Sequence, residues 1–198
     1  MGNLAIPVEN NKLICKNGVI QYSLLTIVDD FEDQNLNEYS GSVSDYTITN
    51  EKAVNNSYSL KSNASAKIIN DSVTVGQGST ITGYLITPAD GMAILQFGVQ
   101  DFDNNYIINL SSFDTDLTLA KKENDNYSTL DSTYVNPTGE WYKIRIEWLP
   151  DNSITCTLYD NNDSLIATVS ATDSTFTSGK IGFDCYKAGA YFDYVYYS

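Results

Sequence analysis

The sequence predicts an all-β protein in which two antiparallel sheets pack face to face. About a dozen short segments alternate apolar and polar residues, and clusters of Asn, Asp, Gly or Pro separate them. The 198 residues include 15 Tyr and 7 Phe, and aromatic side chains favour the pleated, half-buried surface of a strand. No segment has the apolar spacing of an amphipathic helix of three turns. These observations favour a β-sandwich, and the chain is long enough to bury one core.

The chain divides into a short N-terminal segment and one long domain. Residues 1–26 are expected to form a hairpin or an attachment arm, because apolar and polar residues alternate around Lys16-Asn17-Gly18, which suits a tight turn. Residues 27–198 contain no linker and no internal repeat, so we expect a single domain there.

The strands of this domain are expected in chain order, each bounded by turn-forming residues. Pro88 stops one of them, and Asp103-Asn104-Asn105, Pro150-Asp151-Asn152 and residues 160–163 are expected hairpin turns. The expected strands are residues 25–31, 46–49, 57–62, 72–75, 80–87, 93–100, 106–112, 117–122, 142–148, 154–159, 164–170, 180–186 and 190–197.

Two of these strands alternate most regularly and predict which side chains enter the core. In the first, Ala93, Leu95, Phe97 and Val99 share one face, so Gln96 and Gln100 are expected on the other. In the second, the apolar positions are Tyr142, Ile144, Ile146 and Trp148, and the charged residues between them are expected to face outward.

The charge of the chain excludes some partners. Eleven basic and 25 acidic residues, with no His, give a formal net charge of −14. Such a chain repels phosphate backbones and anionic lipid surfaces, so nucleic acid and membranes are not expected partners. The acidity serves solubility, and some of the carboxylates could also hold a hard cation such as calcium.

Three cysteines, Cys15, Cys156 and Cys185, do not form a disulfide framework. Cys156 and Cys185 occupy apolar positions and are expected to be buried, with a bridge between them only if their strands pair. No stretch reaches the roughly 18 apolar residues of a membrane span. The N-terminus also lacks the pattern of a signal peptide.

Three segments resemble the concanavalin A-like lectin/glucanase superfamily, and the resemblance covers residues 27–198. V-D-D-F-E-D (28–33) is similar to its opening strand, residues 140–154 to a Trp-rich strand pair, and F-D-Y-V-Y-Y (192–197) to its closing strand. The resemblance implies a jelly-roll sandwich with a structural calcium ion. Its expected ligands are Asp193, the segment from Asp30 to Glu32, and the turn at Asn56 and Ser57.

The chemistry of the glycosidases on this fold is missing. Those enzymes carry their acids on one strand as E-x-D-x-E or E-x-D-x-x-E, and this chain has no such string. Asp101 and Asp103 abut a turn, and we interpret residues 101–105 as a hairpin tip. Without His there is no Ser-His-Asp machinery. We therefore expect no enzymatic activity.

Sugar recognition needs aromatic faces and planar polar groups on an outer sheet face. The predicted carbohydrate-binding residues are Gln96, Gln100, Tyr106, Asn109 and Arg145. Asn109 and Arg145 are taken to face outward on neighbouring strands. Further tyrosines that could stack on a sugar are Tyr127, Tyr134, Tyr159, Tyr186 and Tyr191.

The expected function is a non-catalytic, lectin-like adhesion domain that binds a glycan or a cell-surface polysaccharide. Without a signal peptide, an extracellular or virion surface such as a capsid or tail is the expected location. Residues 1–26 would attach the domain to other subunits. The alternative is a purely structural decoration or spacer subunit that binds only protein, and homo-oligomers are compatible with both.

Overall fold

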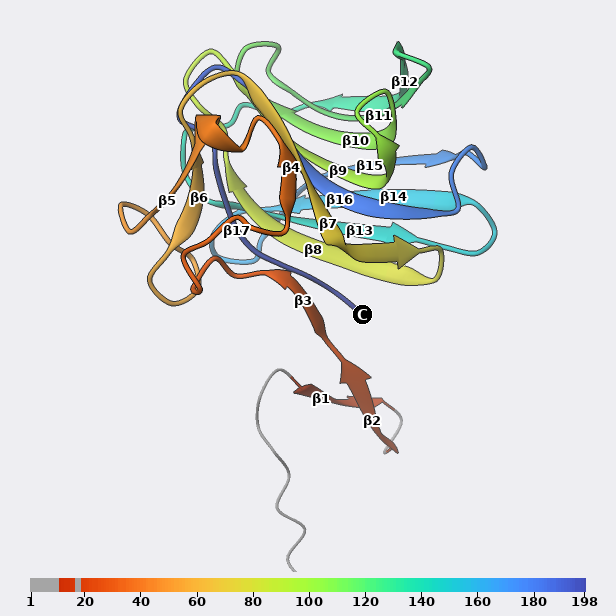
Figure 1. Cartoon of the computed structure of the whole chain (residues 1–198). Coiled ribbons are helices and arrows are strands. Elements are labelled where there is room, and N and C mark those ends of the chain that lie inside the picture. The colour runs from red at the N-terminus through yellow and green to blue at the C-terminus, as the bar shows by residue number, and fades with distance from the viewer. Residues whose placement is uncertain (1–10, 17–18) are drawn as a thin grey trace, which may run out of the picture.

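The computed structural model describes residues 11–16 and 19–198, and it forms a sandwich of two antiparallel sheets (Figure 1). This confirms the predicted fold class. The described residues contain no α-helix, and their only helical turn is the 3-10 turn η1 (Val43–Asp45). No helix in the described part of the chain is long and apolar enough to cross a membrane.

One layer is a seven-stranded sheet, and each strand in it runs antiparallel to its neighbours. In spatial order its strands are β12 (Asn126–Tyr134), β11 (Asp116–Glu123), β10 (Asn104–Ser111), β9 (Met92–Asp101), β16 (Ser178–Tyr186), β7 (Ala66–Gly76) and β4 (Tyr39–Gly41).

The second layer is an eight-stranded sheet, also antiparallel throughout. Its strands in order are β15 (Leu165–Thr172), β14 (Ser153–Tyr159), β13 (Tyr142–Trp148), β8 (Ser79–Ile86), β17 (Tyr191–Tyr197), β6 (Ser59–Ser62) and β5 (Tyr46–Thr49), with β3 (Thr26–Asp29) added on β17.

The order of the strands shows how the chain passes between the layers. Strands β9 to β12 are consecutive in the seven-stranded sheet, and β13 to β15 are consecutive in the eight-stranded sheet. The last two strands then divide: β16 enters between β9 and β7, and β17 enters between β8 and β6 (Figure 1). The C-terminal segment therefore contributes an internal strand to each sheet.

The N-terminal strands form a sheet of their own. β1 (Asn11–Lys16) and β2 (Val19–Leu24) pair antiparallel, with Lys16 opposite Val19. The expected turn residues Asn17 and Gly18, and residues 1–10 of the expected arm, lie outside the described residues. The role of residues 1–26 as an attachment arm stays a prediction.

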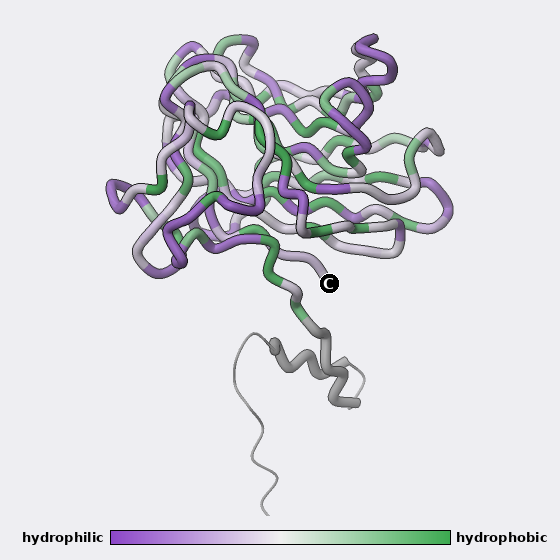
Figure 2. The backbone as a smooth tube through the Cα atoms, in the orientation of Figure 1, coloured by the Kyte–Doolittle hydropathy of each residue, from purple (hydrophilic) through white to green (hydrophobic). Residues whose placement is uncertain are grey.

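The core lies between the two sheets, and hydrophobic residues are concentrated along the strands (Figure 2). The predicted alternation of β13 is confirmed, because its four apolar side chains are buried and the charged ones between them are partly exposed. At the centre the rings of Phe97 and Tyr106 stack at 5.2 Å, and Trp148 meets both edge-on. Aromatic pairs of this geometry add to the hydrophobic stabilisation of the core.

The two cysteines with described side chains do not form a bridge. Cys156 on β14 and Cys185 on β16 are both buried and both free. They belong to different sheets, so their strands do not pair as the bridge would require. Their burial agrees with their apolar sequence positions.

Candidate functional site

The outer face of the seven-stranded sheet presents a row of mostly polar side chains across five strands. Residues directly opposite one another on paired strands point to the same face of the sheet. Ile94 lies between Ala93 and Leu95, which enter the core, so its row faces away from the core. From β7 to β11 the row is Lys67, Asp184, Ile94, Asn109 and Thr118.

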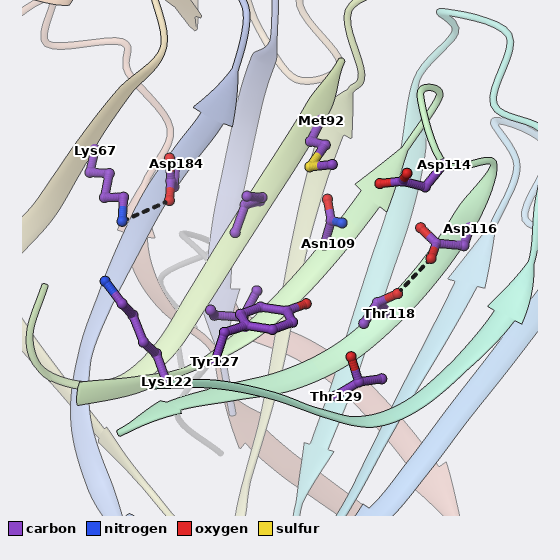
Figure 3. Close-up of a pocket in the computed structure, with 12 residues that line it drawn as sticks. Lys67, Met92, Asn109, Asp114, Asp116, Thr118, Lys122, Tyr127, Thr129 and Asp184 are labelled. Carbon is purple, nitrogen blue, oxygen red and sulfur yellow. Dashed lines mark hydrogen bonds and ion pairs between the residues drawn. The ribbon is translucent and has the colours of Figure 1, made fainter. Parts of the chain in front are cut away.

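This face is hollowed, and the cavity has a volume of about 480 Å³ (Figure 3). Six strands and the β10–β11 turn contribute to it, so segments from most of the domain meet there. The floor is partly apolar and the sides are polar, as in sites that bind small polar ligands. The lining residues are Lys67, Met92, Ile94, Ile107, Asn109, Asp114, Asp116, Thr118, Lys122, Tyr127, Thr129 and Asp184.

One end of the hollow holds hydrogen-bond acceptors that lack a partner. Asp116 Oδ2 accepts a hydrogen bond from Thr118 Oγ1 at 2.9 Å. Asp116 Oδ1 and Asn109 Oδ1 are buried and have no partner among the described residues. Burial raises the pKa of Asp116, and the hydrogen bond from Thr118 opposes this. Buried polar atoms are normally paired, so these two oxygens leave a place for a donor from a ligand or from water.

The other end of the hollow contains ion pairs. Lys67 Nζ lies 3.6 Å from Asp184 Oδ2. Burial raises the pKa of Asp184 to about 6, although the positive charge of Lys67 lowers it. Lys122 Nζ lies 2.9 Å from Asp103 and 2.6 Å from Asp125, so it joins two hairpin tips to the wall of the hollow.

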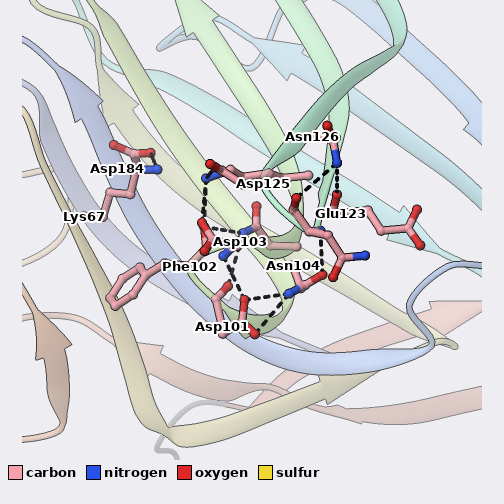
Figure 4. A network of polar contacts seen from close by, with 12 residues as sticks. Lys67, Asp101, Phe102, Asp103, Asn104, Glu123, Asp125, Asn126 and Asp184 are labelled. Carbon is pink, nitrogen blue, oxygen red and sulfur yellow. Dashed lines mark hydrogen bonds and ion pairs between the residues drawn. The ribbon is translucent and has the colours of Figure 1, made fainter.

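These hairpin tips are built from short polar residues that form hydrogen bonds with one another (Figure 4). Asp101 Oδ1 accepts a hydrogen bond from the backbone N–H of Asp103 at 2.8 Å, and both Asp101 oxygens accept from Asn104 Nδ2 at 2.9 and 3.0 Å. The expected hairpin tip at residues 101–105 is thus confirmed, since β9 ends at Asp101 and β10 begins at Asn104. Its acids maintain a turn.

Two exposed tyrosines adjoin the hollow. Tyr127 on β12 is 54% exposed, and in Figure 3 its ring lies between Lys122 and Thr118. Tyr186, 49% exposed, lines a second hollow that shares Lys67, Ile94 and Asp184 with the first. Its ring centroid lies 6.3 Å from that of exposed Phe113. Both tyrosines were among the predicted stacking candidates.

Of the five predicted carbohydrate-binding residues, only Asn109 lines the hollow. Gln96 lies on the same outer face of β9 but is completely buried, so its expected exposure is wrong. The reason is the glycine opposite it on β16: a Cβ at Gly182 would come within 2.8 Å of Gln96 Oε1. The amide therefore lies against the sheet, and neither its nitrogen nor its oxygen has a partner among the described residues.

The remaining three lie elsewhere. Gln100 is exposed at the end of β9, and its Nε2 donates to the carbonyl of Ser178 at 2.6 Å. Tyr106 is completely buried between the sheets, so the prediction that its ring is open to a sugar is wrong. Arg145 lies on β13 in the eight-stranded sheet, where it pairs with Glu147 at 2.9 Å. Asn109 and Arg145 are therefore in different sheets, contrary to the expectation that their strands are neighbours.

The structure brings most of the predicted calcium ligands together. Asp193 Oδ2 accepts hydrogen bonds from the backbone N–H groups of Val54 and Asn55 at 2.6 and 3.2 Å. Glu32 Oε1 accepts from those of Ser57 and Tyr58 at 2.9 and 2.7 Å. The loop around Asn56 is thus tied to both carboxylates, whereas Asp30 Oδ1 accepts from the Glu32 N–H at 3.4 Å.

The chemistry of this donor set fits a hard cation in one respect. Asp193 is completely buried, and its Oδ1 has no partner among the described residues. Burial raises its pKa to about 6, the Val54 and Asn55 N–H groups oppose the rise, and the charge of Glu32 adds to it. The described residues contain no group of three or more His, Cys, Asp or Glu side chains arranged for a metal ion. An ion there would need backbone carbonyls as further ligands.

Several residues of the hollow were missed from the sequence. The sequence predicts only a weak strand, residues 117–122, within a Ser/Thr/Asp/Asn-rich segment. Asp116 precedes this strand and Thr118 lies in it. Alternation alone places Thr118 on the other face of its strand from Leu117 and Leu119, and Asp184 on the other face from Phe183. Their convergence depends on strand order, since β16 pairs with β9 although residues 102–177 lie between the two strands. Alternation does not reveal that order.

Comparisons with known proteins show relatives of the fold. No protein-family model matches the chain. An uncharacterized protein of Methanocaldococcus jannaschii is 26% identical in an alignment 188 residues long, which covers 92% of this chain but only 17% of that protein. The chain therefore spans a small part of this relative.

Among solved structures, carbohydrate-binding module CBM66 of Bacillus subtilis has a TM-score of 0.62 with 20% identity, covering 81% of this chain and 95% of that one. The GH43 protein BlXynB of Bacillus licheniformis gives 0.59 and 11%, with 85% and 38% covered. The VIP36 exoplasmic/lumenal domain, bound to Ca2+ and Man3GlcNAc, gives 0.54 and 8%, with 81% and 82% covered. The matched part of each shares the β-sandwich fold, and at these identities the likeness concerns the fold alone.

Proposed function

We propose that this chain is a non-catalytic, lectin-like carbohydrate-binding domain of the concanavalin A-like superfamily, and that it binds glycan in the hollow of the seven-stranded sheet. The observation that carries the proposal is the composition of that hollow. An exposed aromatic ring, Tyr127, lines the same hollow as the buried acceptors of Asn109 and Asp116. Aromatic faces cover the C–H surface of a sugar, and such acceptors receive its hydroxyl hydrogens.

The fold relatives support this choice among the functions open to a β-sandwich. One is a carbohydrate-binding module, and another was solved with a bound mannose-containing glycan. A part of the GH43 protein BlXynB, 38% of its length, also matches this fold. The strand pattern of acids expected for glucanases of the concanavalin A-like superfamily is missing from this sequence, so we assign binding without cleavage.

Glycan-array binding of the purified chain tests the proposal, with Tyr127→Ala as the diagnostic variant. Loss of the ring removes the stacking surface, and we expect affinity for bound glycans to fall about tenfold or more. Tyr134→Ala is the matched control, because Tyr134 lies on the same strand, is 75% exposed and does not line the hollow. If both variants lose affinity equally, or neither loses any, the glycan-binding site does not lie in the hollow.

We also propose a structural calcium ion at Asp193, with Glu32 and the backbone of the segments around Asp30 and Asn56 as further ligands. The support is the unpartnered, buried Asp193 Oδ1 beside a second carboxylate tied to the same loop. The Ca2+-bound form of the VIP36 domain, a fold relative, also supports the proposal. When bound, the ion would hold β3, β17 and the loop before β6 together.

Thermal unfolding with calcium and with EDTA tests this second proposal. We expect calcium to raise the Tm by several degrees, because a ligand that binds only the folded state stabilises it. Asp193→Asn should abolish that rise, whereas Asp151→Asn, at an exposed hairpin turn, should retain it. A Tm that does not change with calcium in the wild-type chain would eliminate the site.

We propose display on an extracellular or virion surface such as a capsid or tail, with residues 1–26 attached to other subunits. Labelled antibody on intact particles or cells would locate it. The structural alternative draws support from the edge strand β15, where Leu165 and Ile166 are 65% and 41% exposed. If the chain binds no glycan on the array, the structural alternative is favoured.

A further inference from the structure

The charges at one end of the hollow are unbalanced. Asp114 and Asp116 both line this end, and neither takes part in an ion pair within the described residues. Next to them, Asn109 Oδ1 and Asp116 Oδ1 are buried acceptors without partners. All of these oxygens offer lone pairs. A bound molecule therefore meets them favourably only through groups that donate hydrogen bonds.

The two lysines of the hollow do not neutralise the negative charge of Asp114 and Asp116. Lys67 is paired with Asp184 at 3.6 Å, on the opposite side of the floor (Figure 3). Lys122 is paired with Asp103 and Asp125, and its side chain is only 13% exposed. Each ammonium group already faces a carboxylate. The negative charge of these partners weakens the attraction of either lysine for a ligand carboxylate.

We propose that the hollow selects neutral, hydroxyl-rich glycans and rejects sugars that carry a carboxylate, such as uronic acids. This inference rests on the proposed glycan-binding function and adds the class of glycan. Two sugar hydroxyls can donate, one to Asn109 Oδ1 and the other to Asp116 Oδ1. A sugar carboxylate can only accept, so it leaves both oxygens unpaired and is repelled by Asp114 and Asp116.

Matched pairs of polymers test the selectivity. The probes are a β-glucan, a galactan and a mannan, each compared at low salt with the same polymer oxidised at C6 to the uronate. For every neutral polymer that binds, we expect the oxidised form to bind at least about tenfold more weakly, because like charges at close range are strongly disfavoured. Asp116→Asn should reduce that ratio several-fold. Asp151→Asn, with the same change in net charge on a distant turn of the eight-stranded sheet, should leave it unchanged.

The outcomes separate this inference from the function on which it rests. Binding of a neutral polymer and of its oxidised form with equal affinity, or tighter binding of the oxidised form, would overturn the selectivity while the binding function stands. A ratio that Asp116→Asn and Asp151→Asn alter equally would overturn the assignment to this end of the hollow. Binding to none of the six polymers would overturn the binding function and the inference with it.

Discussion

At the scale of single residues, Gln96 shows how a regular strand pattern can hide an unusual environment. Its alternation with Leu95 and Phe97 correctly places it on the outer face of β9. Because Gly182 has no side chain, the Gln96 amide packs against the neighbouring strand and becomes completely buried. An amide buried without hydrogen bonds costs stability. Gln96 therefore opposes folding at a position where an apolar side chain of similar length would fit.

We accordingly predict that Gln96→Met leaves the free energy of unfolding unchanged or raises it by about 1 kcal/mol, since it removes two unpaired polar atoms and retains the length of the side chain. Urea denaturation at neutral pH measures the change. Gln100→Met is the control, and it should lower stability slightly because Gln100 Nε2 donates to the Ser178 carbonyl. A loss of more than about 1 kcal/mol for Gln96→Met would mean that the amide is satisfied in solution.

At the scale of elements, Tyr106 connects β10 to the loop between β15 and β16. Its hydroxyl donates to Asp173 Oδ1 at 2.7 Å and accepts from the Phe176 N–H at 3.2 Å. Burial opposes ionisation of Asp173, but hydrogen bonds from Lys121, Thr175 and Tyr106 outweigh it and hold the pKa of that carboxyl well below its usual range. This loop leads into β16, which supplies Asp184 to the hollow. The tyrosine predicted to bind sugar thus has a structural role.

Tyr106→Phe removes these hydrogen bonds and leaves the Asp173 carboxylate and the Phe176 N–H without their shared partner. We expect the free energy of unfolding to fall by about 1–3 kcal/mol, because a lost buried hydrogen bond leaves polar groups unpaired. Urea denaturation of the variant beside Tyr134→Phe, whose ring is 75% exposed, measures it. Equal stability of Tyr106→Phe and the wild-type chain would contradict this role of the hydroxyl.

Most strands could be predicted from the sequence, but β4, β12 and the pairing of the strands could not. Alternation correctly identified the core face of β13, and turn-forming residues correctly identified the hairpin at Asp101–Asn105. It placed Asn109 and Arg145 on adjacent strands, whereas β10 and β13 belong to different sheets. Strand periodicity is local information, but pairing joins segments that are distant in the chain. The hollow depends on such pairing. Asn109 could be predicted from the alternation of its own strand, whereas Asp184 reaches the hollow because β16 pairs with β9, which alternation does not reveal.

At the scale of the whole molecule, the net charge of −14 conceals two different populations of acids. Exposed carboxylates in turns, such as Asp101 and Asp160, accept hydrogen bonds that lower their pKa values. Three buried carboxylates behave oppositely. Burial raises the pKa of Asp29 to about 7 and those of Asp184 and Asp193 to about 6, despite hydrogen bonds or charges that oppose the rise. Folding therefore favours the protonated forms of these three groups.

The stability of the chain should consequently fall as the pH rises above about 5. Each of the three groups binds protons more tightly in the folded than in the unfolded chain. Their contribution is fully present below the unfolded pKa of about 4 and is lost as the pH rises through about 6 and 7. The turn acids with lowered pKa values lose their contribution only as the pH falls through the acidic range below about 4. Maximum stability should thus lie near pH 5.

We predict that the free energy of unfolding, measured by urea denaturation in EDTA, is at least about 2 kcal/mol greater at pH 5 than at pH 7.5. EDTA matters because an ion at Asp193 would favour the charged carboxylate and oppose the trend. Asp193→Asn or Asp184→Asn should reduce the difference, since each removes one raised pKa, and Asp151→Asn should leave it intact. Stability that is level or rises between pH 5 and pH 7.5 would show that these carboxylates are not held in the folded chain as their burial requires.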